Sequence, residues 1–186
     1  AYGLLQAKAR GVEVVVIPDD EHGQIDVDAL RAEADERVRL VALTHVPTSS
    51  GLVNPAAAVG EVARSVGALY LLDACQSAGQ IPLDVDALHC DFLSLTGRKF
   101  LRGPRGTGLL YVRSTVLDSL APPVFIDGHS ADWTDVDTYR LQPDSGRFEL
   151  FETNFAAKAG FGVAIGYALS VGLDAIRARV TDLADG

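Results

Sequence analysis

Short apolar runs that end in polar residues recur along the first half of the chain. The first run spans residues 12–17, is rich in β-branched side chains and is closed by the turn sequence Pro18-Asp19-Asp20. Similar runs span 38–43, 68–72 and 91–95. Runs of this length and composition, bounded by turn residues, are typical of buried strands. The pattern therefore predicts four strands of one buried sheet.

Helical patterns lie between these runs. Segment 26–34 has an acidic first turn and good helix formers, and the next segment begins with Asn54 as an expected N-cap and ends at Gly67. Pro55 suits the first helical position, and apolar residues follow it at helical spacing. Strands that alternate with helices form parallel sheets through right-handed crossovers. We therefore predict an α/β fold with a mostly parallel sheet and helices on both faces.

The second half of the chain predicts a different set of connections. Segment 107–112 follows the preceding strand too closely for a crossover helix, so it should pair with that strand in the antiparallel sense. Between 122 and 149 the pattern fades, which predicts a long irregular connection with Trp133 as its packing anchor. Two helices are expected over 156–169 and 174–183, with a break at Gly172. We see no repeat or linker, so residues 1–186 are predicted to form a single domain.

Charge and composition exclude several classes of protein. The chain carries 16 Lys plus Arg and 25 Asp plus Glu, a formal net charge of −9, which argues against a surface for nucleic acid or anionic membranes. No run of about 18 apolar residues and no leader pattern is present, so we predict a cytoplasmic protein with no membrane partner. Cys75 and Cys90 lack paired spacing, which predicts buried, reduced thiols and no metal site. The chain opens as though a helix were already under way, which we interpret as a fragment cut at both ends.

Asp73 and Lys99 are the first candidates for chemistry. Each follows a predicted strand, and ligands of open α/β sheets bind beyond the carboxyl ends of the strands. A desolvated lysine is a good imine-forming nucleophile. Pyridoxal phosphate needs such a lysine for its Schiff base and a carboxylate beside its pyridine nitrogen. Asp73 and Lys99 meet both needs.

Three further polar residues fit the same cofactor. Gln76 is placed to reach the phenolic oxygen of the ring, and Thr96 with Arg98 would flank the phosphate. An isolated Asp after a strand is more often a cap or a turn former, but Asp-x-x-Gln together with Thr-Gly-Arg-Lys at this spacing favours function. Segment 103–108 is glycine-rich but precedes a strand rather than a helix, so it fails the dinucleotide fingerprint and predicts a tight turn.

Two motifs resemble a known family. They are LLDACQSAGQIPLD at 71–84 and LTGRKFLRGPRGTGLLYV at 95–112. Both resemble the class V aminotransferase and cysteine desulfurase family of fold type I pyridoxal-phosphate enzymes, over almost the whole chain. The combination of THVPTSSGLVNP at 44–55 with TGRKFLRGPRGTG at 96–108 is most similar to members of that family that resemble hercynylcysteine S-oxide lyase of ergothioneine biosynthesis.

The resemblance implies roles for the residues that match the motifs. Lys99 would be the catalytic lysine that forms the Schiff base, Asp73 would pair with the pyridine nitrogen, and Gln76 would contact the phenolic oxygen. Thr96 and Arg98 would bind the phosphate. Family members commonly carry His in place of Arg98, and this departure argues against an ordinary cysteine desulfurase.

Two cofactor-binding roles are implied at the margins of the motifs. Thr48 occupies the place where desulfurases carry an Asn near the phenolic oxygen. Thr153 falls where the family supplies a phosphate contact to the neighbouring subunit of a homodimer. The resemblance also implies an N-terminal segment and a C-terminal small domain that these 186 residues do not include.

The resemblance implies an enzyme that acts on a small-molecule amino acid or a sulfur-containing amino-acid conjugate. Cleavage of a C–S bond by β-elimination is the first interpretation, and transamination or epimerisation by the same family are the alternatives. A non-catalytic truncated domain is the alternative from another class. A nucleotide-binding α/β domain is a third interpretation, which would be indifferent to Lys99→Ala.

Overall fold

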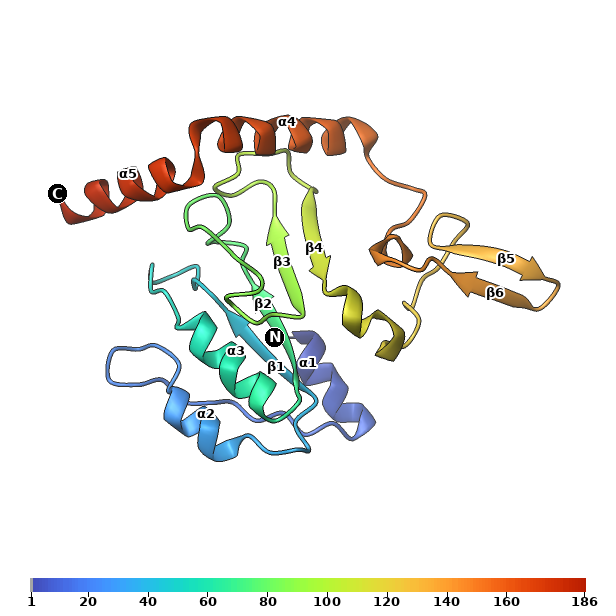
Figure 1. Ribbon diagram of the computed structural model, residues 1–186, viewed down its shortest axis with the longest axis horizontal. Coiled ribbons are helices and arrows are strands. Elements are labelled where there is room, and N and C mark those ends of the chain that lie inside the picture. The colour runs from blue at the N-terminus through green and yellow to red at the C-terminus, as the bar shows by residue number, and fades with distance from the viewer. Residues whose placement is uncertain (1) are drawn as a thin grey trace.

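The computed structural model describes residues 2–186 and is built on a four-stranded sheet in the order β1-β2-β3-β4 (Figure 1). The strands are β1 (Leu40–Thr44), β2 (Leu69–Asp73), β3 (Phe92–Thr96) and β4 (Gly108–Val112). Strands β1, β2 and β3 run parallel to one another, and β4 is antiparallel to β3. Three of the four strands predicted from apolar runs, and the antiparallel return strand, are therefore confirmed.

Helices α2 (Val27–Glu33) and α3 (Ala56–Ser65) enclose the core together with this sheet. The apolar spacing along α3 places Val59, Val62 and Ala63 in the interior against the buried Tyr70 and Leu72 of β2. Alternate residues of β1 are exposed on the other side of the strand. The predicted α/β class with a mostly parallel sheet is confirmed, with α3 packed on β1 and β2.

The helix starts follow local side-chain chemistry. The carboxylate of Asp26 caps α2 by accepting hydrogen bonds of 2.9 Å from the backbone N–H groups of Asp28 and Ala29. The expected cap of α3 is wrong, because the Asn54 side chain binds elsewhere. Its amide donates to the Thr44 carbonyl at 2.9 Å and its oxygen accepts from the Ile25 N–H at 3.0 Å. Asn54 therefore joins loops and does not cap the helix.

The strand predicted over 12–17 is not formed. Val12, Val15 and Val16 are 50%, 54% and 83% exposed, and the one bridge nearby joins Asp19 to Ile25. A β-branched run fits a pleated sheet, but it becomes a strand only where a neighbour satisfies its backbone groups. No strand pairs with this run among residues 2–186, so it forms no regular secondary structure.

The connection predicted to be irregular contains a hairpin. Strands β5 (Ala131–Asp135) and β6 (Thr138–Leu141) pair in the antiparallel sense and project from the main sheet (Figure 1). Trp133 lies opposite Tyr139 across the hairpin and is 82% exposed, so it is not the predicted packing anchor. The connecting turn lacks the Asn-Gly or Asp-Gly signal of a tight hairpin, which explains why the pattern was missed.

The remaining elements are helical. They are α1 (Tyr2–Ala7), η1 (Lys8–Arg10), η2 (Ser114–Ser119), η3 (Ser145–Phe148), α4 (Phe155–Val171) and α5 (Leu173–Asp185). The predicted break at Gly172 is confirmed, with φ of 90° and a bend of 76° between α4 and α5. Helix α4 runs across the end of the sheet towards which β3 points (Figure 1). Among the described residues no single helix is long and apolar enough to cross a membrane, although the bent pair α4 and α5 together meets the test of length and composition.

Candidate active site at the carboxyl ends of the strands

The sheet brings the predicted site residues to one edge. Asp73 is the last residue of β2, and it lies in register with Thr44 at the end of β1 and with Ser94 of β3. The segments that follow these parallel strands therefore leave the sheet at the same end. This is the end at which open α/β sheets bind ligands.

Asp73 begins a tight turn. Its Oδ1 accepts a hydrogen bond of 2.9 Å from the backbone N–H of Cys75. Its Oδ2 accepts none from any residue of 2–186, so one carboxylate oxygen is available to a ligand. Burial and the nearby Asp73 carboxylate raise the pKa of the Cys75 thiol to about 11, while Lys99 acts in the opposite direction.

Lys99 lies on a closed turn after β3. The backbone N–H of Gly97 donates to the Thr107 carbonyl at 2.9 Å, and that of Gly103 donates to the Gly97 carbonyl at 2.7 Å. The N–H of Arg102 donates to the Lys99 carbonyl at 2.9 Å, with Arg102 in the left-handed region at φ of 58°. The Lys99 side chain is half-buried and forms no ion pair within residues 2–186. The turn therefore fixes a lysine whose amine is uncommitted.

Helix α4 packs directly on this turn. A Cβ placed on Gly97 or on Gly103 would come within 2.8 Å of the Phe161 ring. The Arg102 guanidinium lies 5.8 Å from the centre of the Tyr167 ring, also on α4. The guanidinium of Arg102 therefore lies against α4. Close packing of glycine on an aromatic ring couples the position of the Lys99 turn to α4.

The structure joins Gln76 and Thr48. The Gln76 side-chain amide donates to the Thr48 hydroxyl at 2.9 Å, across the loops that follow β2 and β1. Both side chains are therefore presented at the same edge of the sheet as Asp73. Their second hydrogen-bonding groups remain available to a ligand oxygen.

The three residues predicted to contact the phosphate do not lie together. The Thr96 hydroxyl donates to the Thr107 carbonyl at a long 3.4 Å, and Arg98 is exposed beside Lys99. Thr153 is exposed directly before Asn154, the N-cap of α4, and no hydrogen bond within residues 2–186 joins it to the other predicted residues. Thr96 and Arg98 thus lie on the Lys99 turn, whereas Thr153 lies at the start of α4.

Sequence reasoning missed a buried pair behind these loops. His45, which the sequence analysis does not single out, is a buried core residue whose Nδ1 lies 3.0 Å from the Ser77 hydroxyl. Burial lowers the pKa of His45. The only signal in the sequence was the place of His45 directly after an apolar run, since its partner lies 32 positions away.

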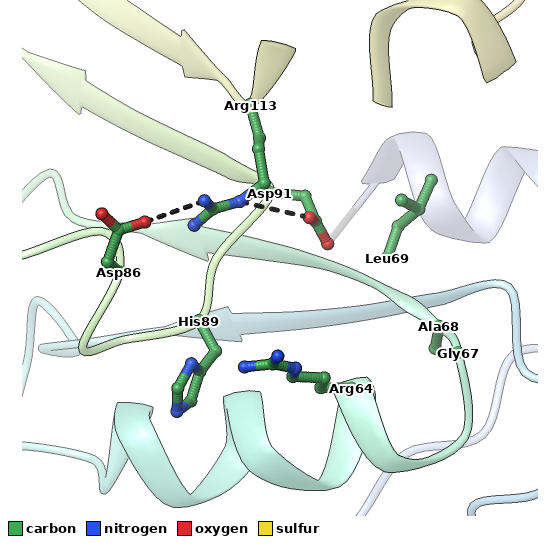
Figure 2. A pocket seen from close by; sticks show the side chains of 8 residues that line it. All are labelled: Arg64, Gly67, Ala68, Leu69, Asp86, His89, Asp91 and Arg113. Atoms are coloured by element: carbon green, nitrogen blue, oxygen red, sulfur yellow. Dashed lines mark hydrogen bonds and ion pairs between the residues drawn. The ribbon is translucent and has the colours of Figure 1, made fainter. Parts of the chain in front are cut away.

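A cavity of about 450 Å³ lies at the other end of the strands, lined by Leu69, Asp86, His89, Asp91 and Arg113 among others (Figure 2). Its Arg113 is paired with Asp86 at 2.8 Å and with Asp91 at 3.6 Å. These pairs tie the end of β4 to the loop before β3. The position at the amino ends of the parallel strands is not where open α/β sheets bind ligands, so we assign this cavity a structural role.

Comparisons with known proteins identify the family of the chain. A family described as "Aminotransferase class-V" matches residues 4–186. The chain is 37% identical over 173 residues to a "Probable cysteine desulfurase" of Methanothermobacter thermautotrophicus, covering 93% of this chain and 43% of that protein. The chain therefore spans less than half the length of this curated relative.

Two solved structures also superpose on most of this chain. A cysteine desulfurase from Escherichia coli, in an S-sulfonic acid form, superposes with a TM-score of 0.84 at 27% identity, covering 92% of this chain and 43% of that chain. A cystine C-S lyase in complex with its product cysteine persulfide superposes with a TM-score of 0.70 at 28% identity, covering 78% of this chain and 39% of that chain.

Proposed function

The chain belongs to the class-V aminotransferase family, and from that membership we propose that it carries the cofactor-binding part of an enzyme that cleaves a C–S bond in a sulfur-containing amino acid. The observation that supports this most directly is the half-buried Lys99, unpaired among residues 2–186, on the turn that follows β3 at the end of the sheet where β2 ends in Asp73. Relatives named cysteine desulfurase and a cystine C-S lyase support sulfur amino acids as substrates.

Pyridoxal phosphate is the cofactor of this family, and the residues of this chain fit it. The Lys99 amine is free for an imine, and Asp73 keeps one carboxylate oxygen free for a protonated ring nitrogen. Gln76 and Thr48 offer an amide and a hydroxyl to the phenolic oxygen. Thr96 and Arg98 offer a hydroxyl and a cation to the phosphate. When bound, this cofactor stabilises negative charge that develops on the substrate Cα.

The proposed steps assign one proton to Lys99. The substrate amine displaces the Lys99 amine, which then removes the proton from the substrate Cα as a general base. The electron pair left on Cα forms a double bond to Cβ as the Cβ–S bond breaks, and the sulfur leaves with the electron pair of that bond. Asp73 keeps the ring nitrogen protonated throughout. The closed turn at 97–103 holds the lysine in place, which lowers the entropic cost of the proton transfer.

The chemistry at Lys99 can be tested by trapping. The intact protein is incubated with pyridoxal phosphate, reduced with borohydride, and its modified peptides are mapped by mass spectrometry. We expect one adduct, on Lys99, that is lost in Lys99→Ala and weakened at least about fivefold in Asp73→Ala. The chain has only two other lysines, Lys8 and Lys158, so Lys8→Ala and Lys158→Ala are matched controls that should keep the adduct.

The products identify the reaction. With cystine or cysteine as substrate, β-elimination gives pyruvate and ammonia, whereas desulfuration gives alanine. Transamination requires an oxo-acid acceptor, and epimerisation gives the D-amino acid. Pyruvate formation would support β-elimination, and alanine would keep C–S cleavage but assign it to desulfuration. A product of transamination or epimerisation would replace the proposal with that alternative. Adducts scattered over Lys8 and Lys158, or none, would favour the non-catalytic domain.

We also propose the assembly that the resemblance implies. Residues 1–186 would form the core of the large domain of a homodimer in which Thr153 contacts the phosphate bound by the partner. The exposed apolar side chains of α4 support an interface there, since Val163, Tyr167 and Leu169 are all exposed. The two free cysteines support a reducing compartment, for which we propose the cytoplasm.

A further inference from the structure

The imidazole of His45 is buried under the two loops that carry Thr48 and Gln76. It directly follows β1, is 6% exposed, and its Nδ1 lies 3.0 Å from the Ser77 hydroxyl. Ser77 is fully buried, and its hydroxyl donates to the Ala74 carbonyl at 3.4 Å. The Ser77 hydroxyl can both donate and accept, so it pairs with the His45 Nδ1 in either tautomer of the imidazole.

The backbone of His45 strengthens the same connection. Its N–H donates to the Asp73 carbonyl at 2.9 Å, and its carbonyl accepts from the Asn54 N–H at 2.8 Å. The Asn54 side chain in turn donates to the Thr44 carbonyl. The end of β1 and the start of the Asp73 turn are therefore held together by main chain and side chains at once.

Two side-chain hydrogen bonds join these loops, one buried and one exposed. Thr48 lies three residues after His45, and Gln76 lies one residue before Ser77. The exposed Gln76–Thr48 bond of 2.9 Å competes with water, so it contributes little by itself. The buried His45–Ser77 bond is persistent, because breaking it would leave polar groups unsatisfied in the interior. The buried bond therefore sets the spacing at which the exposed bond forms.

We propose that His45 is a positioning residue that acts through Ser77 to hold Gln76 and Thr48 at the spacing that receives the phenolic oxygen of the cofactor. This role rests on the proposed function for the identity of the ligand. The coupling between the two loops does not rest on the proposed function, because its contacts lie within the chain. Burial lowers the pKa of His45, which keeps the imidazole neutral with a single N–H at neutral pH.

The coupling is measured first, by hydrogen–deuterium exchange of the intact protein without added cofactor. The variants are His45→Leu, Ser77→Ala and the two combined. We expect amides of 44–50 and 73–80 to exchange about tenfold faster in either single variant, the effect of losing one buried hydrogen bond. The double variant should be no faster than the singles, because both changes remove the same bond.

Two further variants separate positioning from general damage. His45→Asn keeps a hydrogen-bonding group near the place of Nδ1 and should recover much of the protection, and it carries the test with Ser77→Ala if His45→Leu does not fold. His22→Leu, at an exposed histidine in a turn, is the matched control and should leave the exchange of both loops unchanged. Equal exchange in the His45, Ser77 and His22 variants, or additive effects of the first two, would overturn the coupling.

The second measurement links the coupling to the cofactor. His45→Leu and Ser77→Ala should weaken binding of pyridoxal phosphate about five- to tenfold and shift the visible absorption maximum of the bound cofactor, while Lys99 is still labelled. Unchanged affinity and absorption in both variants would overturn the positioning role. Absence of labelling at Lys99 in the wild type would refute the proposed function instead, and the exchange data would still decide whether His45 couples the loops.

Discussion

The buried imidazole of His45 makes the stability of the fold depend on pH. Burial lowers its pKa in the folded protein, whereas in the unfolded chain histidine takes up a proton near pH 6.5. Between these two values the unfolded state binds more protons, so the free energy of unfolding falls as the pH falls. His45 therefore opposes folding on the acid side of neutrality and is without such an effect well above pH 6.5.

Urea unfolding at pH 7.5 and pH 5.5 measures this contribution. The wild type should lose more stability between the two values than His45→Asn, which cannot take up the proton. His22→Asn removes an exposed histidine and should keep the loss of the wild type. An equal loss in the wild type and His45→Asn would show that the imidazole is not held neutral by the fold.

At the scale of elements, the contact between α4 and the Lys99 turn depends on Gly103. The added Cβ of Gly103→Ala would lie 2.8 Å from the Phe161 ring, its nearest neighbour and too close for any real contact. We expect a loss of about 1–3 kcal/mol from overpacking and weaker labelling of Lys99 by pyridoxal phosphate. Gly162→Ala on the same helix meets nothing within 4 Å and should be neutral or stabilise by up to about 1 kcal/mol. Urea midpoints of the two variants measure the difference, and equal midpoints would contradict close packing.

Local patterns in the sequence were enough to predict the elements that bury a regular face. The runs that became β1, β2 and β3 were located within two residues, and so were α2 (Val27–Glu33) and the break at Gly172. In each of these strands and helices, the spacing of the apolar residues itself indicates which side chains are buried. The run at 12–17 has the same composition but no partner strand among residues 2–186, and strand pairing is not a local property.

The same distinction explains the site. Asp73, Gln76, Lys99 and Thr96 were placed at one edge of the sheet because they end predicted parallel strands. The contact between Gln76 and Thr48 follows from that edge, since the loops after β1 and β2 are neighbours. The bond between His45 and Ser77 could not be predicted, because it depends on side-chain burial across 32 positions. Thr153 was carried over from the resemblance alone, and its role stays a prediction.

At the scale of the whole molecule, positive charge is concentrated at the proposed site. The chain has a formal net charge of −9, yet residues 92–117 contain no Asp or Glu. The basic residues of this stretch are Arg98, Lys99, Arg102, Arg105 and Arg113. All of these except Arg113 lie on the Lys99 turn or next to it, where they would attract the phosphate of the cofactor and the carboxylate of an amino acid.

The exposed face of α4 makes the proposed homodimer testable. Val163 is 74% exposed on this helix, and a surface valine surrounded by other apolar side chains is typical of an interface. A charge there would have to be buried unpaired, so Val163→Glu should weaken dimerisation of the intact protein at least about tenfold. Val124→Glu is the matched control, because Val124 is 91% exposed in the connection outside α4 and should leave dimerisation unchanged. Light scattering over a dilution series gives the dissociation constants. A monomeric wild type, or equal constants for the wild type and Val163→Glu, would remove α4 from the interface and with it the support for Thr153 as a contact to the partner's phosphate.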